Sequence, residues 1–325
     1  MTDTLSLAVT NLTSPAVLAF ALGLVAVLLR GDLRLPDSVY QGLSMYLLLA
    51  IGVKGGVALR QAGISAVIVP AGATIALGVV IPLLAFSALR AVTRLGPVDR
   101  AAMAAHYGST SLVTFTAGLV FLESAKVQFE GFAATLLTLL EIPGIVVGLL
   151  LASRHLGRSM SWSTSLQEVL VSRSVLLLAG GLVIGLTTGP VGYAKVEPFF
   201  GGLFNGMLTL FLLEMGSLVG RRLRDFKSAG VGLIAFAVVF PVIAGTLGIV
   251  TGLLVGLSTG GATVLGILCA SASYIAAPAA VRLALPEANP GFYLTASLGV
   301  TFPFNLAVGI PLYLAIAQAL AGKIG

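Results

Sequence analysis

Charged residues are scarce in this chain. Only 9% of its 325 residues are Asp, Glu, Lys or Arg, whereas 58% are hydrophobic, and a soluble globular domain would carry about 25% charged residues. Cysteine occurs once, at Cys269, so a disulfide framework is excluded. The polar connections between apolar stretches are too short to fold alone. These scarcities indicate an integral membrane protein whose spans are not interrupted by a soluble domain.

Ten apolar stretches follow one another along the chain. Each is long enough, at about 1.5 Å per helical residue, to cross a hydrocarbon core of roughly 30 Å. Backbone polar groups in lipid must be satisfied within their own segment, so the stretches are expected to be helices. Forty glycines and fourteen prolines suit closely packed membrane helices. The predicted spans are 14–29, 39–59, 64–89, 101–121, 131–152, 169–188, 199–220, 229–256, 260–285 and 292–321.

The second five stretches repeat features of the first five about 160 residues later. The recurring features, at offsets of 159 or 160, are Pro82 and Pro241, Gly131 with Phe132 and Gly291 with Phe292, and Pro143 and Pro303. Because each repeat holds an odd number of spans, the second copy is expected to be inverted in the bilayer, as in many secondary transporters. The predicted organisation is a first repeat at 1–152, a cytoplasmic linker at 153–168 and a second repeat at 169–325.

The basic residues are distributed unequally between the two sides of a ten-span arrangement. One side carries Arg30, Arg34, Arg90, Arg94, Arg100, Arg154, Arg158, Arg173, Arg221, Arg222, Arg224, Lys227 and Arg282, and the other carries Arg60, Lys126, Lys195 and Lys323. Loops rich in Lys and Arg stay in the cytoplasm. The pattern predicts a multi-pass protein of the cell inner (plasma) membrane, with the 90–100, 153–168 and 221–228 loops inside and both termini outside.

A run of small and hydroxyl-bearing residues interrupts the fourth stretch. Gly108, Ser109, Thr110 and Ser111 form a poor continuous helix. Where a membrane helix breaks, freed carbonyls and hydroxyls can replace the water around a cation such as sodium, and the N–H groups of the next half-helix attract an anion. Alternatively, Ser and Thr side chains hydrogen-bond to the preceding turn or join neighbouring helices.

The ninth stretch contains a matching interruption at Ser271, Ala272 and Ser273. Pro278 follows within five residues of Ser273 and cannot donate its backbone hydrogen bond, which weakens continuation of the helix. Two matched breaks at similar depth in inverted halves favour a shared site. The predicted substrate-binding residues are Gly108, Ser109, Thr110, Ser111, Ser271, Ala272 and Ser273.

Polar residues in the fifth and tenth stretches add to this site. Glu141 precedes Pro143, and Thr301 and Asn305 flank Pro303 in the matching place. An intramembrane carboxylate costs a few kcal/mol unless it faces a cavity, pairs or is protonated, so Glu141 is the best single candidate for binding a cation. It could instead bond a neighbouring hydroxyl. Asn305 could give its amide oxygen to a cation or bridge two helices.

Three further polar residues lie inside predicted spans. Lys54 and Glu214 are equivalent in the two repeats, and we expect them to form an ion pair that joins two helices. His106 could titrate near neutrality and shuttle protons, but beside Tyr107 we favour a hydrogen-bonded packing residue.

Several motifs together resemble one transporter family. They are Lys54 with Gly55 and Gly56, the run His106 to Ser111 with Thr114, Glu141 to Pro143, and Ala270 to Pro278 followed by Leu285 to Pro290. The sequence is similar over nearly its whole length to sodium-dependent bicarbonate transporters of the SbtA type, and the stretch 270–290 is the most specific part of the resemblance.

The resemblance implies a fold and a function. It implies ten helices in a five-plus-five inverted repeat, related to bile-acid:sodium symporters and NhaA-like proteins, with broken helices 4 and 9 that cross. Spans 1, 2, 6 and 7 would form a gate domain and the others a core domain. Members form trimers through the gate domain and take up bicarbonate with sodium, and a PII-like cytoplasmic protein inhibits them. The resemblance also implies that the ion and anion site is lined by Ser109, Ser111 and Thr114 with Ser271 and Ser273. With the polar residues of the fifth and tenth stretches added, the predicted sodium ligands are Ser109, Ser111, Thr114, Glu141, Ser273, Thr301 and Asn305.

Other functions on the same fold stay open. The chain could carry another small or organic anion with sodium, exchange sodium for protons through Glu141, or bind an anion as a receptor without transporting it. An intramembrane hydrolase that uses Ser109 or Ser111 with His106 is disfavoured, because residues three and five apart on a broken helix rarely align as base and nucleophile and no acid orients the histidine. We therefore do not expect an enzyme.

Overall fold

The computed structural model describes the chain except for residues 1–8, 32, 157–166, 168, 223–225 and 325. The described part is helical, without β-strands. The first half contains α2 (Pro15–Leu28), α3 (Asp37–Ala62), α4 (Ile64–Val92), α5 (Pro97–Gly108), α6 (Leu112–Ser124) and α7 (Ala133–Leu156). The second half contains α9 (Arg173–Ala194), η1 (Pro198–Gly202), α10 (Phe204–Arg222), α11 (Phe226–Leu254), α12 (Thr259–Ala270), α13 (Ala276–Ala284), α14 (Pro290–Leu294), η3 (Thr295–Thr301), α15 (Phe302–Phe304), η4 (Asn305–Gly309) and α16 (Ile310–Ile324).

Six helical segments in the described residues are long and apolar enough to cross a membrane. They are α3, α4, α7, α9, the part of α11 from Gly230 to Leu254, and the continuous stretch from α14 to α16, Pro290–Lys323. The helices α2 and α12 are apolar but shorter. This agrees with a polytopic membrane protein. The predicted linker at 153–168 lies mostly outside the described residues, and α7 runs four residues into it, to Leu156.

Several helix boundaries follow from local sequence. The hydroxyls of Ser14, Ser172 and Ser258 accept hydrogen bonds from backbone N–H groups in the first turns of α2, α9 and α12, which satisfies donors that a helix start leaves free. Gly63 separates α3 from α4 with φ of 79°, a conformation that glycine adopts without steric cost. Capping serines and one turn glycine thus position consecutive membrane helices.

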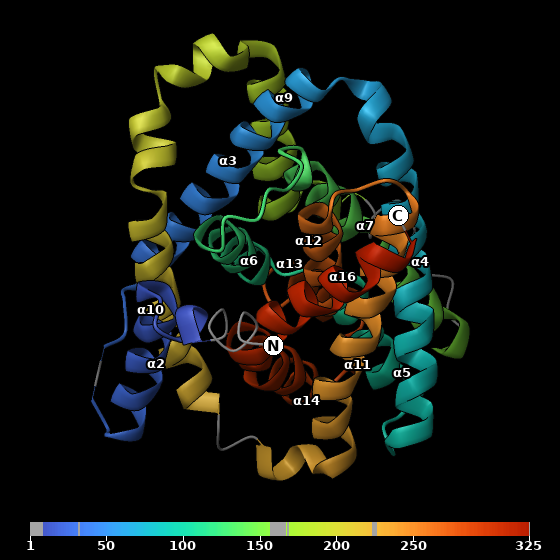
Figure 1. Ribbon diagram of the computed structural model, residues 1–325. Helices are drawn as coiled ribbons and strands as arrows, with labels where there is room; N and C mark the ends of the chain where they lie inside the picture. The colour runs from blue at the N-terminus through green and yellow to red at the C-terminus, as the bar shows by residue number, and fades with distance from the viewer. Residues whose placement is uncertain (1–8, 32, 157–166, 168, 223–225, 325) are drawn as a thin grey trace.

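Two helix pairs lie on one side of the molecule, α2 beside α10 and α3 beside α9 (Figure 1). Glycines bring the backbones of each pair together. A Cβ atom on Gly216 of α10 would overlap the Phe20 carbonyl of α2, and one on Gly185 of α9 would overlap the Val53 carbonyl of α3. Small residues at such contacts are what permits close packing of membrane helices.

The remaining helices form a second group, with α4 and α5 at its edge and α12 among α6, α11 and α16 (Figure 1). Its interior includes Tyr107 of α5, whose ring packs edge-on against Phe236 and Phe240 of α11. The Tyr107 hydroxyl bonds to the Thr301 hydroxyl at 2.7 Å. The two groups meet where α3 and α9 pack against α7.

The expected ion pair between Lys54 and Glu214 is wrong. One Glu214 oxygen pairs with Arg221 at 2.9 Å, and the other accepts a hydrogen bond from the Leu35 backbone at 2.7 Å. The Lys54 ammonium instead lies over the Phe204 ring, 5.2 Å from its centroid. The spacing of 160 residues predicted a similar depth for Lys54 and Glu214 but not the directions of their side chains. Arg221 instead shares a helix face with Glu214.

Candidate functional site

The chain leaves helical geometry at two places, between α5 and α6 and between α12 and α13. Gly108 ends α5 and Leu112 begins α6, with Ser109 and Ser111 in extended conformations. In the second half α12 ends at Ala270, Ser271 is extended, and α13 begins at Ala276. Each apolar stretch therefore consists of two half-helices joined by a few residues outside the helices.

The two breaks are in direct contact. The Ser111 N–H donates to the Ser271 Oγ at 2.9 Å, and the Thr110 hydroxyl lies 3.1 Å from the same oxygen. The Ser271 hydroxyl also donates to the Leu268 carbonyl. On the other side of the contact, the Ser273 N–H donates to the His106 carbonyl at 2.8 Å. Backbone groups released by one break are thus satisfied by the other, as burial requires.

Serine hydroxyls cap the half-helices that follow the breaks. The Ser111 Oγ accepts from the N–H of Thr114 at 3.2 Å and from its hydroxyl at 3.1 Å. The Ser273 Oγ accepts from the Ala277 N–H at 3.1 Å. The N-termini of α6 and α13 therefore both lie beside the contact between the two breaks. Each carries a partial positive charge.

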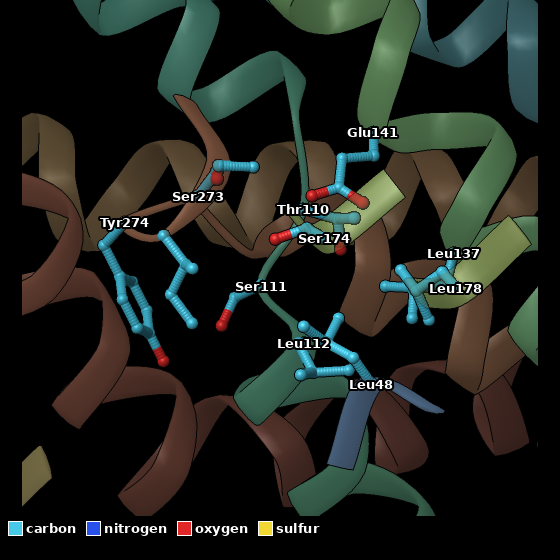
Figure 2. Close-up of a pocket in the computed structure, with 12 residues that line it drawn as sticks. Leu48, Thr110, Ser111, Leu112, Leu137, Glu141, Ser174, Leu178, Ser273 and Tyr274 are labelled. Carbon is cyan, nitrogen blue, oxygen red and sulfur yellow. The ribbon is translucent and has the colours of Figure 1, made fainter. Parts of the chain in front are cut away.

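A small buried pocket adjoins the contact between the breaks, and we call it the central pocket. Its polar lining comprises Thr110, Ser111, Glu141, Ser174, Ser273 and Tyr274, and its apolar lining comprises Leu48, Leu112, Leu137, Leu178, Ile275 and Ala276. Figure 2 shows the Glu141 carboxylate beside Thr110 and Ser174, and the hydroxyls of Ser111 and Tyr274 in another part of the pocket. The pocket therefore lies between α7, both breaks, and α3 and α9.

Glu141 is the one carboxylate among the described residues that line the central pocket. It is 5% exposed, and its Oε2 atom has no hydrogen-bond partner among the residues that the structure describes. A buried polar atom without a partner is costly, by about 1–3 kcal/mol and more when charged. Glu141 is therefore available to bind a cation or a proton that enters the pocket.

The donor set of the central pocket suits a sodium ion as a transported substrate. It offers hydroxyl and carboxylate oxygens, which hard cations prefer. In the described ranges, no group of three or more His, Cys, Asp or Glu side chains is placed to hold a metal ion. The pocket volume of about 10 Å³ is room for about one water-sized particle, so an oxyanion needs a wider conformation.

Comparison with known proteins decides the family. A model of the Na⁺-dependent bicarbonate transporter superfamily matches residues 15–318. The chain belongs to this superfamily. The resemblance of the sequence motifs is thereby confirmed, and membership places the chain among Na⁺-dependent membrane transporters rather than enzymes. No curated protein matches the chain.

The two expected sodium ligands of the tenth stretch, Thr301 and Asn305, lie outside the lining of the central pocket. The Thr301 hydroxyl donates to the Ala237 carbonyl at 2.6 Å besides its bond to Tyr107. The Asn305 amide donates to the Ala270 carbonyl at 2.8 Å and accepts from the Tyr313 hydroxyl at 2.8 Å. Asn305 therefore satisfies a carbonyl at the C-terminus of α12. Of the two roles that the sequence allowed, this contact is the bridge between helices.

Five further predicted residues lie at the breaks without lining the pocket: Gly108, Ser109, Thr114, Ser271 and Ala272. Gly108 packs against Pro82 and Gly144, and Ala272 is buried. The Ser109 hydroxyl is buried and has no partner in the described part of the chain. His106 makes packing contacts: its Nδ1 lies 2.7 Å from the Ala102 carbonyl and its ring stacks on Tyr293.

Sequence reasoning missed two residues of the transporter's central pocket. Ser174 lies in the first turn of α9, where a serine commonly belongs to a helix start. Tyr274 stands in the predicted break, and its aromatic ring packs against Phe302. Only the approach of α9 to the break, which depends on tertiary packing, brings Ser174 into the site.

Of the larger cavities in the described part of the transporter, two bear on access to the central pocket. The first, of about 270 Å³, is lined by Arg173 of α9 and shares Leu48, Ser174, Ile275 and Ala276 with the central pocket. We call it the Arg173 cavity. The second, of about 290 Å³, is lined by Lys54 of α3 and shares no lining residue with the central pocket. We call it the Lys54 cavity. The central pocket therefore adjoins the Arg173 side and is closed from the Lys54 side.

Proposed function

We propose that the chain carries bicarbonate into the cell together with sodium, by alternating access at the central pocket. The observation that carries this proposal is the contact between the two breaks, where the Ser111 N–H bonds to Ser271, beside the unpartnered carboxylate of Glu141. A cation site and the positive ends of two half-helices are thereby available in one place.

The two substrates would use different parts of the site. Sodium would bind Glu141 and the hydroxyls of the predicted set around Ser111, Thr114 and Ser273, with Ser109 reached as the pocket rearranges. Bicarbonate would bind near the N-termini of α6 and α13. At a membrane potential of about −100 mV a single negative charge faces about 2.3 kcal/mol against import. One sodium ion neutralises that charge, and the sodium gradient drives uptake.

The movement proposed for this cycle is a displacement of one helix group against the other. Helices α2, α3, α9 and α10 would be the gate domain, and the remaining helices the core domain of a ten-span inverted repeat. The central pocket adjoins the Arg173 cavity, which lies on the side rich in basic residues. With that side in the cytoplasm and both termini outside, the conformation is inward-facing.

The proposal extends to assembly. We propose a homotrimer joined through the gate domain in the cell inner membrane, as the family resemblance implies. A PII-like regulator would dock on the cytoplasmic loops, of which residues 157–166 and 223–225 lie outside the described residues.

Uptake of radiolabelled bicarbonate into vesicles containing the purified protein tests the proposal. We expect uptake that requires an inward sodium gradient and is lost in Ser111→Ala and in Glu141→Ala. Ser87→Ala is the matched control, since Ser87 is exposed on α4 and bonds only to its own helix. Uptake that is indifferent to sodium would contradict the proposal.

Sodium/proton exchange is a second candidate function. The free Oε2 of Glu141 and the small volume of the central pocket favour it, because a cation and a proton fit where an oxyanion does not. A pH-sensitive dye inside bicarbonate-free vesicles distinguishes the two. A sodium gradient that moves protons without bicarbonate supports exchange, and a silent dye supports symport. Competition of uptake by small organic anions tests whether the substrate is another anion.

A further inference from the structure

A lysine lies within a membrane-spanning helix without an acidic partner. Lys54 belongs to α3, which runs from Asp37 to Ala62, and its ammonium contacts the Phe204 ring at 5.2 Å. Among the described residues, no carboxylate forms a salt bridge with it. A cation in this position is costly unless it faces a water-filled cavity or has a partner. The ring contact supplies only part of the compensation.

The Lys54 cavity provides the water-filled surroundings that an intramembrane ammonium group needs. Its volume of about 290 Å³ corresponds to several water molecules at about 30 Å³ each, so it can hold a hydrated small ion. Helices α3, α6, α7 and α10 all contribute to its wall. The side chains that give it chemical character are Lys54, Glu123, Phe129, Phe204 and Asn205.

The Lys54 cavity is aligned with the central pocket along the same two helices. On α3, Leu48 lines the central pocket and Ile51 and Lys54 line the cavity. On α7, Leu137 lines the central pocket and Ala134 lines the cavity. Residues three or four apart share a helix face, so the two spaces follow one another on the same faces. At 1.5 Å per residue, Leu48 and Lys54 are about 9 Å apart along the axis.

We propose that the Lys54 cavity is a second anion-binding site, which captures a small monovalent oxyanion such as bicarbonate before it reaches the central pocket. This inference rests on the proposed function. The Phe204 ring holds the ammonium at the cavity wall, where its charge attracts an anion. Glu123 on the same wall opposes the attraction. The captured anion is therefore bound weakly enough to move on when the layer between the two spaces opens.

Kinetics of bicarbonate uptake test the second site. Loss of the local charge lowers the concentration of anion at the cavity, so Lys54→Gln raises the KM for bicarbonate about tenfold. The maximal rate and the KM for sodium change little, because the central pocket is intact. Lys54→Arg keeps the charge and retains a KM near that of the parent protein. Glu123→Gln changes the KM in the opposite direction, to a lower value.

Lys126→Gln is the matched control. Lys126 is an exposed lysine beyond the end of α6, close in sequence to Glu123, but it does not line the cavity. A KM in Lys54→Gln equal to that in Lys126→Gln overturns the inference. If Lys54→Gln does not fold, as judged by its melting temperature, Glu123→Gln decides: an unchanged KM overturns the second site, and a lowered one supports it.

The experiment separates this inference from the proposed function. Absence of sodium-dependent uptake in the parent protein contradicts the proposed function itself. If the parent protein takes up bicarbonate normally and neither Lys54→Gln nor Glu123→Gln changes the KM for bicarbonate, only the second site is contradicted. Rising ionic strength gives an independent readout, because screening should raise the KM of the parent protein and leave that of Lys54→Gln nearly constant. An equal response of the two proteins counts against the site.

Discussion

Ser271→Ala is expected to weaken the contact between the two breaks. The Ser271 hydroxyl makes three hydrogen bonds, to the Ser111 N–H, the Thr110 hydroxyl and the Leu268 carbonyl. Side-chain hydrogen bonds in membrane proteins contribute about 0.6 kcal/mol each on average, so the loss of three destabilises the folded protein by about 2 kcal/mol. Since 1.4 kcal/mol is tenfold, the ratio of folded to unfolded protein falls roughly 30-fold.

Melting temperature and initial rates of sodium-driven bicarbonate uptake would measure this effect. Ser297→Ala is the control: Ser271 and Ser297 are both 0% exposed, but Ser297 makes one bond, to the Tyr293 carbonyl of its own helix segment. We expect Ser271→Ala to lower both quantities far more than Ser297→Ala. Equal effects in the two variants would refute the reasoning, because the contact between the breaks would then contribute no more than an ordinary bond within a helix.

Three further substitutions test other parts of the site. Gly144→Val should abolish uptake and lower the melting temperature, because a Cβ on Gly144 overlaps the backbone of the first break, whereas Gly180→Val, with nothing within 4 Å of the added Cβ, should do neither. In Glu141→Gln the stabilisation by sodium should disappear from thermal unfolding curves, since a ligand at 100 times its Kd stabilises by about 2.7 kcal/mol; a sodium shift equal to that of the parent protein would exclude Glu141 as a ligand. Asn305→Ala should lower the melting temperature more than Tyr313→Phe, because it strands both the α12 carbonyl and the tyrosine hydroxyl, and the reverse order would show that the bridge has little importance.

The positions of the breaks could be predicted because local composition determines them. Glycine and hydroxyl-bearing residues are weak helix formers, and the run from Gly108 to Ser111 is where the chain leaves helical geometry. The same holds for Ser271, which is extended after α12. Apolar length likewise predicted the helical, membrane-spanning character of the chain.

Side-chain partners could not be predicted in the same way, because they depend on helix rotation and packing. Glu214 pairs with Arg221, seven residues away on its own helix, rather than with Lys54. The Asn305 amide bonds to the last carbonyl of α12 and to the Tyr313 hydroxyl. From the sequence alone, an amide oxygen at this depth would equally suit a cation ligand. The family match settles the class of protein, while the roles of the individual residues stay predictions.

The distribution of close glycine contacts fits the gate and core domains that we propose for the transporter. Within the group of α2, α3, α9 and α10, Gly216 and Gly185 lie against backbone carbonyls of the partner helix, and in the other group Gly144 lies against the backbone of the first break. Between the groups, Gly55 and Gly131 meet only alanine residues across the interface. Backbones that interlock resist sliding because a densely packed contact has few alternative arrangements. We therefore expect the proposed movement to occur along the surface between α3 and α7, which is also where the Lys54 cavity and the central pocket lie.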